Sequence, residues 1–179
     1  MMKKSILFLI MVSLMCLTSA CGARDKEVNL TKTGELYTTE DGVSFYYPKD
    51  YEISVVSDLD DLNGVNTVEF TKDNNMLYFT VVNDNTDNLV EDKDELYTGM
   101  LEQSKASDVE VLKPVLDSGL DVYEYIYEYS ETGVKSKEIV YFLEDKTYIY
   151  GYRTVKDEFA DNEEEMTVYL ESFSMAVGK

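Results

Sequence analysis

The stretch Asp121–Ser130 reads DVYEYIYEYS, in which tyrosine alternates with valine, isoleucine or glutamate. Because side chains in a β-strand point alternately to the two faces of a sheet, its four tyrosines should share one face. They are Tyr123, Tyr125, Tyr127 and Tyr129. A similar alternation continues in Val134–Glu144 and Thr147–Thr154. The three segments therefore predict adjoining antiparallel strands.

The turns between these segments predict a register. Glu131-Thr132-Gly133 suits a three-residue hairpin loop with a left-handed Gly133, which pairs Ser130 with Val134. A two-residue turn at 145–146 then adds the third strand. Eight tyrosines would share one face: Tyr123, Tyr125, Tyr127, Tyr129, Tyr141, Tyr148, Tyr150 and Tyr152. The opposite face would be aliphatic, with Val122, Ile126, Val140, Phe142 and Ile149. A shift of one residue at the loop would mix the two faces.

Two interpretations of the tyrosine face are open. The rings can pack beneath a helix with their hydroxyls at the rim, or form an exposed, rigid platform that stacks on sugars or peptides. A buried phenol without a hydrogen bond costs about 1–3 kcal/mol. We therefore expect Tyr127 and Tyr129, beside the Gly133 turn, to be partly exposed. The candidate contact surface is Tyr123, Tyr125, Tyr127, Tyr129, Tyr148, Tyr150 and Tyr152.

The rest of the chain predicts more strands and two helices. The further strands are Leu36–Thr39, Val43–Pro48, Tyr51–Val56, Val65–Lys72, Met76–Val82 and Val109–Val115. An amphipathic helix is expected from Asn88, as its N-cap, to about Ser104. A second helix is expected to span Lys156–Met175, with Asp161 and Glu164 as a capping box. Short turns between the strands imply an antiparallel sheet and an α+β fold.

Two motifs carry a family resemblance. The hairpin GVSFYYPKDY, at Gly42–Tyr51, and the closing Leu170-Glu-Ser-Phe173 resemble the PsbP-like fold. Photosystem accessory proteins, Mog1-type proteins and many small bacterial lipoproteins share that fold. The resemblance implies a PsbP-like domain over 35–179, with an antiparallel sheet flanked by an internal and a C-terminal helix. It also implies a binding or accessory role. The histidine metal ligands of the photosynthetic branch have no counterpart, because the chain has no His.

The N-terminus has the features of an export signal. Lys3 and Lys4 precede an apolar run, and LTSAC at 17–21 resembles a bacterial lipobox. We expect a signal peptide over 1–20, a lipidated Cys21, and a polar tether completing 21–34. Ordinary secretion with a free Cys21 is the alternative. Lipidation predicts a membrane-anchored, extracytoplasmic domain.

Composition narrows the classes of function. Sixteen Lys and Arg against 36 Asp and Glu give a net charge of −20, which disfavours nucleic acid and anionic lipid as partners. Without His, Ser-His-Asp catalysis and His-ligated metals are excluded. Removal of Cys16 with the signal and lipidation of Cys21 leave no disulfide. We expect no cofactor and no structural metal.

Acidic residues leave two alternatives to a simple binding module. The loops Asp58–Gly64 and Asn83–Asp94 are rich in the oxygen ligands that calcium prefers, although their spacing departs from an EF-hand. A facing pair of carboxylates could support a small hydrolase. The sequence favours a non-catalytic binding or accessory module for a protein or an envelope polymer, with calcium-dependent binding second and hydrolysis third.

Overall fold

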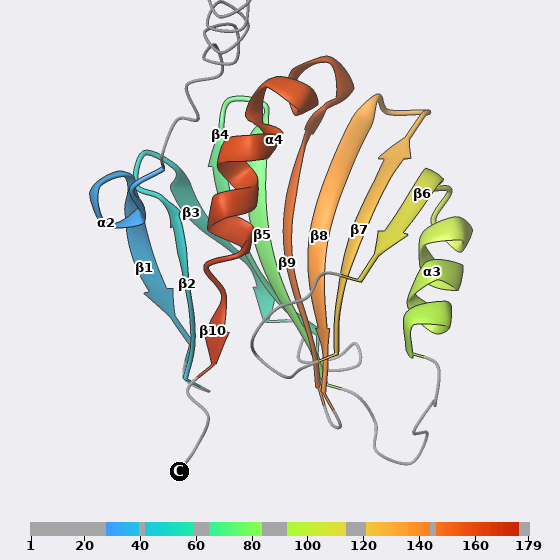
Figure 1. Cartoon of the computed structure of the whole chain (residues 1–179), viewed down its shortest axis with the longest axis horizontal. Coiled ribbons are helices and arrows are strands. Elements are labelled where there is room, and N and C mark those ends of the chain that lie inside the picture. The colour runs from blue at the N-terminus through green and yellow to red at the C-terminus, as the bar shows by residue number, and fades with distance from the viewer. Residues whose placement is uncertain are drawn as a thin grey trace, which may run out of the picture.

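The computed structural model describes residues 28–39, 42–58, 65–83, 93–113, 121–143 and 146–175 (Figure 1). Its large sheet contains β3 (Glu52–Asp58), β4 (Val65–Lys72), β5 (Asn75–Asn83), β6 (Ser107–Leu112), β7 (Asp121–Tyr129), β8 (Val134–Phe142) and β9 (Lys146–Val155). A small sheet contains β1 (Gly34–Thr38), β2 (Val43–Pro48) and β10 (Ser174–Met175). The helices are α2 (Leu30–Thr33), α3 (Lys93–Gln103) and α4 (Lys156–Leu170).

The large sheet is antiparallel throughout, in the order β3-β4-β5-β9-β8-β7-β6. Its central strand is β9, so the segment that follows the tyrosine hairpin is paired on both sides. The chain between β5 and β9 in sequence forms the other half of the sheet, and β9 then returns to pair with β5. Mixed helices and antiparallel sheets make the fold α+β.

One face of the large sheet carries the main core. The small sheet and α4 pack on this face (Figure 1), and α4 contacts β2, β8 and β9. Phe45 of β2 meets Tyr150 of β9 with ring centroids 4.4 Å apart, and Tyr47 meets Phe70 of β4 at the same separation. Burial of these large rings holds the two sheets together.

The opposite face is covered over β6, β7 and β8 by α3. Tyr97 of α3 packs on Tyr125 with ring centroids 4.8 Å apart, and Leu101 is buried beside it. This face holds a second core cluster separate from the first. Among the described residues, no helix is both long and apolar enough to cross a membrane.

The C-terminal helix begins at the predicted residue but ends earlier than predicted, and its predicted capping box is wrong. It begins at Lys156, whose N–H donates to the Gly133 carbonyl (2.8 Å), so Asp161 and Glu164 lie inside the helix and form no capping box. The helix ends at Leu170, and Ser174–Met175 pairs with β2 as a strand instead of continuing the helix. Ser172 lies in the connection, where its hydroxyl donates to the Tyr169 carbonyl and accepts the Tyr46 N–H.

The segment before β1 also packs on the domain. Val28 and Leu30 contact the main core, and the Tyr169 hydroxyl donates to the hydroxyl of Thr33 (2.8 Å). Part of the 21–34 stretch that the sequence assigns to the tether is therefore in contact with the domain. Cys21 and the predicted signal over 1–20 lie outside the described residues.

Candidate functional site

The tyrosines do not share one face, so the predicted register is wrong. Tyr129 pairs with Val134, which leaves a four-residue loop in place of the predicted three. Gly133 is left-handed as predicted (φ 67°), but the N–H groups of Thr132 and Gly133 both bond to the Tyr129 carbonyl and close the loop one residue earlier. The shift moves every residue of β7 to the other side.

The eight tyrosines are consequently divided between the two core clusters. Those of β7 lie on the α3 side: Tyr123, Tyr125, Tyr127 and Tyr129. Those of β8 and β9 lie on the α4 side: Tyr141, Tyr148, Tyr150 and Tyr152. The predicted aliphatic face is mixed too, because Val122 and Ile126 lie on the α4 side, whereas Val140, Phe142 and Ile149 lie on the α3 side. The division gives each face fewer hydroxyls to satisfy.

Most of the predicted contact residues are packed side chains. Tyr125, Tyr127, Tyr148, Tyr150 and Tyr152 are buried, and Tyr123 and Tyr129 are partly exposed. The prediction that Tyr127 is partly exposed is therefore wrong, since Tyr127 is only 4% exposed. The same prediction for Tyr129 is confirmed. Two of the buried phenols donate to acceptors on other strands: Tyr150 to the Tyr46 carbonyl and Tyr152 to the Asn75 side chain, both at 2.7 Å.

The buried hydroxyl of Tyr127 donates to the Glu138 carboxylate, which is the centre of a buried hydrogen-bond network. Three phenols converge on its carboxylate: Tyr127 of β7 (2.9 Å) and Tyr78 of β5 donate to Oε1, and Tyr97 of α3 donates to Oε2 (2.7 Å). The residue is 4% exposed. Strands β5, β7 and β8 and helix α3 are thus joined at one carboxyl group.

Burial and hydrogen bonding oppose each other at this carboxyl group. Burial raises the pKa of Glu138, while hydrogen bonds from Tyr78, Tyr97 and Tyr127 and the charge on Arg153 lower it, with burial the largest effect. The pKa values of the same three tyrosines are also raised, mainly by burial and then by the nearby carboxylate. The phenols are therefore donors to Glu138 and not sources of phenolate.

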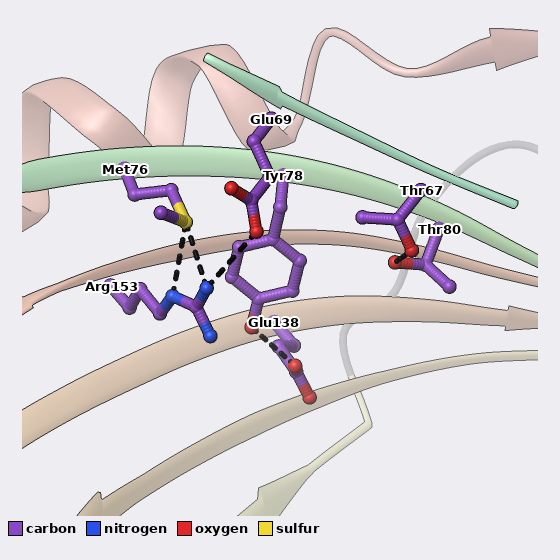
Figure 2. Close-up of polar contacts among 7 residues, drawn as sticks. All are labelled: Thr67, Glu69, Met76, Tyr78, Thr80, Glu138 and Arg153. Carbon is purple, nitrogen blue, oxygen red and sulfur yellow. Dashed lines mark hydrogen bonds and ion pairs between the residues drawn. The ribbon is translucent and has the colours of Figure 1, made fainter. Parts of the chain in front are cut away.

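Tyr78 reaches Glu138 by crossing the strand between them. Tyr78 on β5 is paired with Gly151 on β9, which is paired in turn with Glu138 on β8. A Cβ atom at Gly151 would lie 2.3 Å from Tyr78 Cζ, so only glycine leaves room for the ring. The phenol lies over this glycine. Its hydroxyl donates to the Glu138 carboxylate (Figure 2).

A second group of polar side chains lies beside this network, on the same side of the sheet. Arg153 donates through Nη2 to Glu69 Oε1 (3.2 Å), and through Nε and Nη2 to Met76 Sδ (3.1 and 2.9 Å) (Figure 2). Its guanidinium lies over the Tyr78 ring, 5.2 Å from the centroid. The hydroxyls of Thr67 and Thr80 meet at 2.9 Å.

We call this group the polar face, and it consists of Thr67, Glu69, Met76, Tyr78, Thr80 and Arg153. All except Tyr78 are partly exposed. Tyr97 of α3 packs on Tyr125 of β7 and Phe142 of β8 and donates to Glu138, and Lys93 of α3 donates to the Leu143 carbonyl. The polar face therefore joins a rigid buried network to the surface of the sheet.

Another buried charge lies on the α4 side of the sheet. Lys137 is 7% exposed, and its Nζ lies 3.3 Å from Glu124 Oε1 and 3.4 Å from Glu163 Oε1. This contact joins β7, β8 and α4. The charge of the buried Lys137 is compensated by the two neighbouring carboxylates, so we assign this group a structural role.

The described residues hold no cluster of three or more Cys, Asp or Glu side chains placed to bind a metal ion. Residues 59–64 and 84–92, which make up most of the two predicted calcium loops, lie outside the described residues. The absence of a structural metal stays a prediction.

Sequence reasoning missed Glu138, Tyr78 and Arg153. Glu138 is a charged residue within a predicted strand, which signals either a solvent-facing position or a buried network. Only the register decides between the two. Arg153 had a simpler signal, because it is the only Arg of the chain besides Arg24.

Comparison with known proteins supports the fold and goes no further. No family model and no curated protein matches the chain. Among solved structures, the cyanobacterial PsbP protein (CyanoP) of Synechocystis sp. PCC 6803 is similar, with a TM-score of 0.58 and 16% identity over 87% of this chain and 98% of that one. A Pseudomonas aeruginosa protein of unknown function has a TM-score of 0.47 and 9% identity, over 81% of this chain and 99% of that one. The fold is PsbP-like.

Proposed function

We propose that this chain is a membrane-anchored, extracytoplasmic lipoprotein that acts as a non-catalytic binding or accessory module for a protein or an envelope polymer. Its contact surface is the polar face of β4, β5 and β9. We propose in addition that the antiparallel sheet is flanked by an internal helix and a C-terminal helix, as in the PsbP-like arrangement. The sequence supports the anchor through Lys3 and Lys4, the apolar run after them and the lipobox-like LTSAC at 17–21, and it supports the binding role through the PsbP-like motifs.

The occupancy of Glu138 is the observation that carries the binding proposal. A general acid or base must reach a proton on the substrate. Both oxygens of Glu138 instead accept phenols of the protein, and the residue is almost fully buried. This carboxyl group therefore stiffens the sheet beneath the polar face, and a stiff, partly exposed surface loses little entropy on binding.

A capture experiment tests the contact surface. Thr80→Arg would place a long, charged side chain in the polar face, whereas Thr38→Arg makes the same change at an exposed position of β1. Full-length tagged chains would be purified from gently solubilised native envelope, and the co-purified protein and polymer would be quantified. We expect Thr80→Arg to lose specific species that the Thr38→Arg chain retains. Equal capture by both variants would contradict the proposal.

The anchor has its own test. Cys21→Ala should leave the chain unprocessed or release it from the membrane fraction, whereas Cys16→Ala should behave as the parent chain. Normal maturation and membrane partition of Cys21→Ala, together with their loss in Cys16→Ala, would contradict lipidation at Cys21.

A further inference from the structure

Arg153 has poor partners for its donors. A guanidinium has five N–H donors in a planar fork that suits both oxygens of a carboxylate. Here Glu69 offers it one oxygen, and two of its bonds go to the thioether sulfur of Met76. Thioether sulfur is a weak acceptor. A better acceptor from outside the chain would therefore replace Met76 at little cost.

The guanidinium is also held in place and turned towards solvent. It lies over the Tyr78 ring, and that ring is fixed by Gly151 beneath it and by Glu138 at its hydroxyl. The Arg153 side chain is 41% exposed, against 19% for Glu69. The Arg153 side chain is thus more exposed to solvent than that of its counter-ion Glu69. Because the Tyr78 ring already holds the guanidinium in place, the Arg153 side chain loses little conformational freedom when a ligand binds.

The charge of the whole chain limits which acids can approach. A net charge of −20 repels polyanions and attracts basic surfaces. A single carboxylate among basic residues meets both conditions, because the basic residues are attracted by the field and the carboxylate pairs with Arg153. A polyanionic polymer meets only the second condition.

We propose that Arg153 is a carboxylate-binding residue of the polar face, and that the ligand is a basic polypeptide segment that inserts one carboxylate between the guanidinium and Met76. This rests on the proposed function, since it names the partner chemistry of the same surface. The incoming carboxylate takes over Nε and Nη2 as a bidentate acceptor, while Glu69 stays beside the guanidinium.

The probes are two acetylated hexapeptides that alternate lysine and glycine, one with a free C-terminal carboxylate and one with a carboxamide. Full-length chain in neutral nanodiscs would be titrated with each by surface plasmon resonance at low salt. We expect the carboxylate peptide to bind about tenfold more tightly, a preference of about 1.4 kcal/mol. Arg153→Gln should abolish the preference, and Arg153→Lys should restore part of it.

Lys105→Gln is the matched control, because it removes one positive charge from an exposed ion pair with Glu131. It should keep the preference. Polygalacturonate should not displace the carboxylate peptide at equal carboxylate concentration.

Equal binding of the two peptides by the parent chain, an unchanged preference in Arg153→Gln, or displacement by polygalacturonate would each overturn the inference. If one of these occurs while Thr80→Arg still loses envelope capture, the inference fails and the proposed function stands. If Thr80→Arg instead captures as much from the envelope as Thr38→Arg does, the proposed function itself is contradicted.

Discussion

The phenol of Tyr78 lies directly over Gly151, whose missing side chain leaves the space the ring occupies. The contact lets a residue of β5 bond to Glu138 two strands away. A glycine in the interior of a strand ordinarily weakens it. Here the loss is offset by a cross-strand hydrogen bond to a buried carboxylate.

Gly151→Ala should therefore be strongly destabilising. Its Cβ atom would meet Tyr78 at 2.3 Å, so the ring must move and its bond to Glu138 must break. We expect a loss of about 2–4 kcal/mol in the free energy of unfolding, measured by urea denaturation. Gly99→Ala is the control, since it lies in α3 with nothing within 4 Å of the added atom. It should be neutral or stabilising by up to about 1 kcal/mol. Equal effects of the two changes would contradict this geometry.

Tyr127→Phe should cost more than Tyr129→Phe. Tyr127 donates to the buried Glu138, whereas Tyr129 shares a hydrogen bond with the exposed Ser104 (3.2 Å). Loss of a bond to a buried acceptor costs about 1–3 kcal/mol, and an exposed pair contributes well under about 1 kcal/mol. Thermal unfolding of the two variants compares them. A Tyr129→Phe chain as unstable as Tyr127→Phe would show that Glu138 does not distinguish the two phenols.

Glu138 predicts a pH dependence of definite sign. Its pKa is raised in the folded chain, so the folded state holds the proton more tightly than the unfolded state does. Stability from this group is complete below the ordinary pKa of 4.5 and is lost as pH rises through the raised pKa. The stability of the parent chain minus that of Glu138→Gln should fall as pH rises from 4.5 towards neutrality, by at most about 1.4 kcal/mol per pH unit. Urea denaturation across that range measures the difference. A difference that grows with pH would mean that the three phenols outweigh burial.

Ser136→Ala should be neutral or stabilising. Ser136 is 1% exposed, and its hydroxyl has no hydrogen-bond partner in the described structure. Replacing a buried, unsatisfied hydroxyl with hydrogen removes a desolvation cost. Ser172→Ala is the contrasting variant, because that hydroxyl bonds to Tyr46 N–H and to the Tyr169 carbonyl. Of the two variants, we expect only Ser172→Ala to lower the melting temperature. A clear loss in Ser136→Ala would reveal a partner for its hydroxyl.

Calcium should not change the stability of the domain. A fold that needs calcium binds it through six to eight oxygens at fixed positions, and the acidic loops lack the EF-hand spacing. Melting temperatures in calcium and in chelator should agree. A melting temperature that is much higher in calcium than in chelator would instead favour calcium-dependent binding, with Asp58–Gly64 or Asn83–Asp94 as the site.

Local sequence predicts strands well and their register poorly. The bounds of β2 and β4 agree with Val43–Pro48 and Val65–Lys72, because turn residues lie on both sides of each strand. The loop before Val134 is different, since a left-handed Gly133 suits both a three-residue and a four-residue loop. Contacts distant in sequence make the choice: the observed register places Tyr127 and Tyr97 on Glu138. The polar face depends on the pairing of β5 with β9, two strands far apart in the sequence, so local sequence could not predict it.

Photo-cross-linking tests the central claim most directly, because it reports contact in the native envelope. A photoreactive phenylalanine derivative would replace Thr80 in the polar face or, as the matched control, Thr38 on β1, in otherwise full-length chain. After irradiation of intact cells, we predict a discrete cross-linked species from position 80 that position 38 does not give, and its yield should drop when Arg153→Gln is added. Cross-linking that is equal at the two positions, or that occurs only from position 38, would contradict a contact surface on β4, β5 and β9.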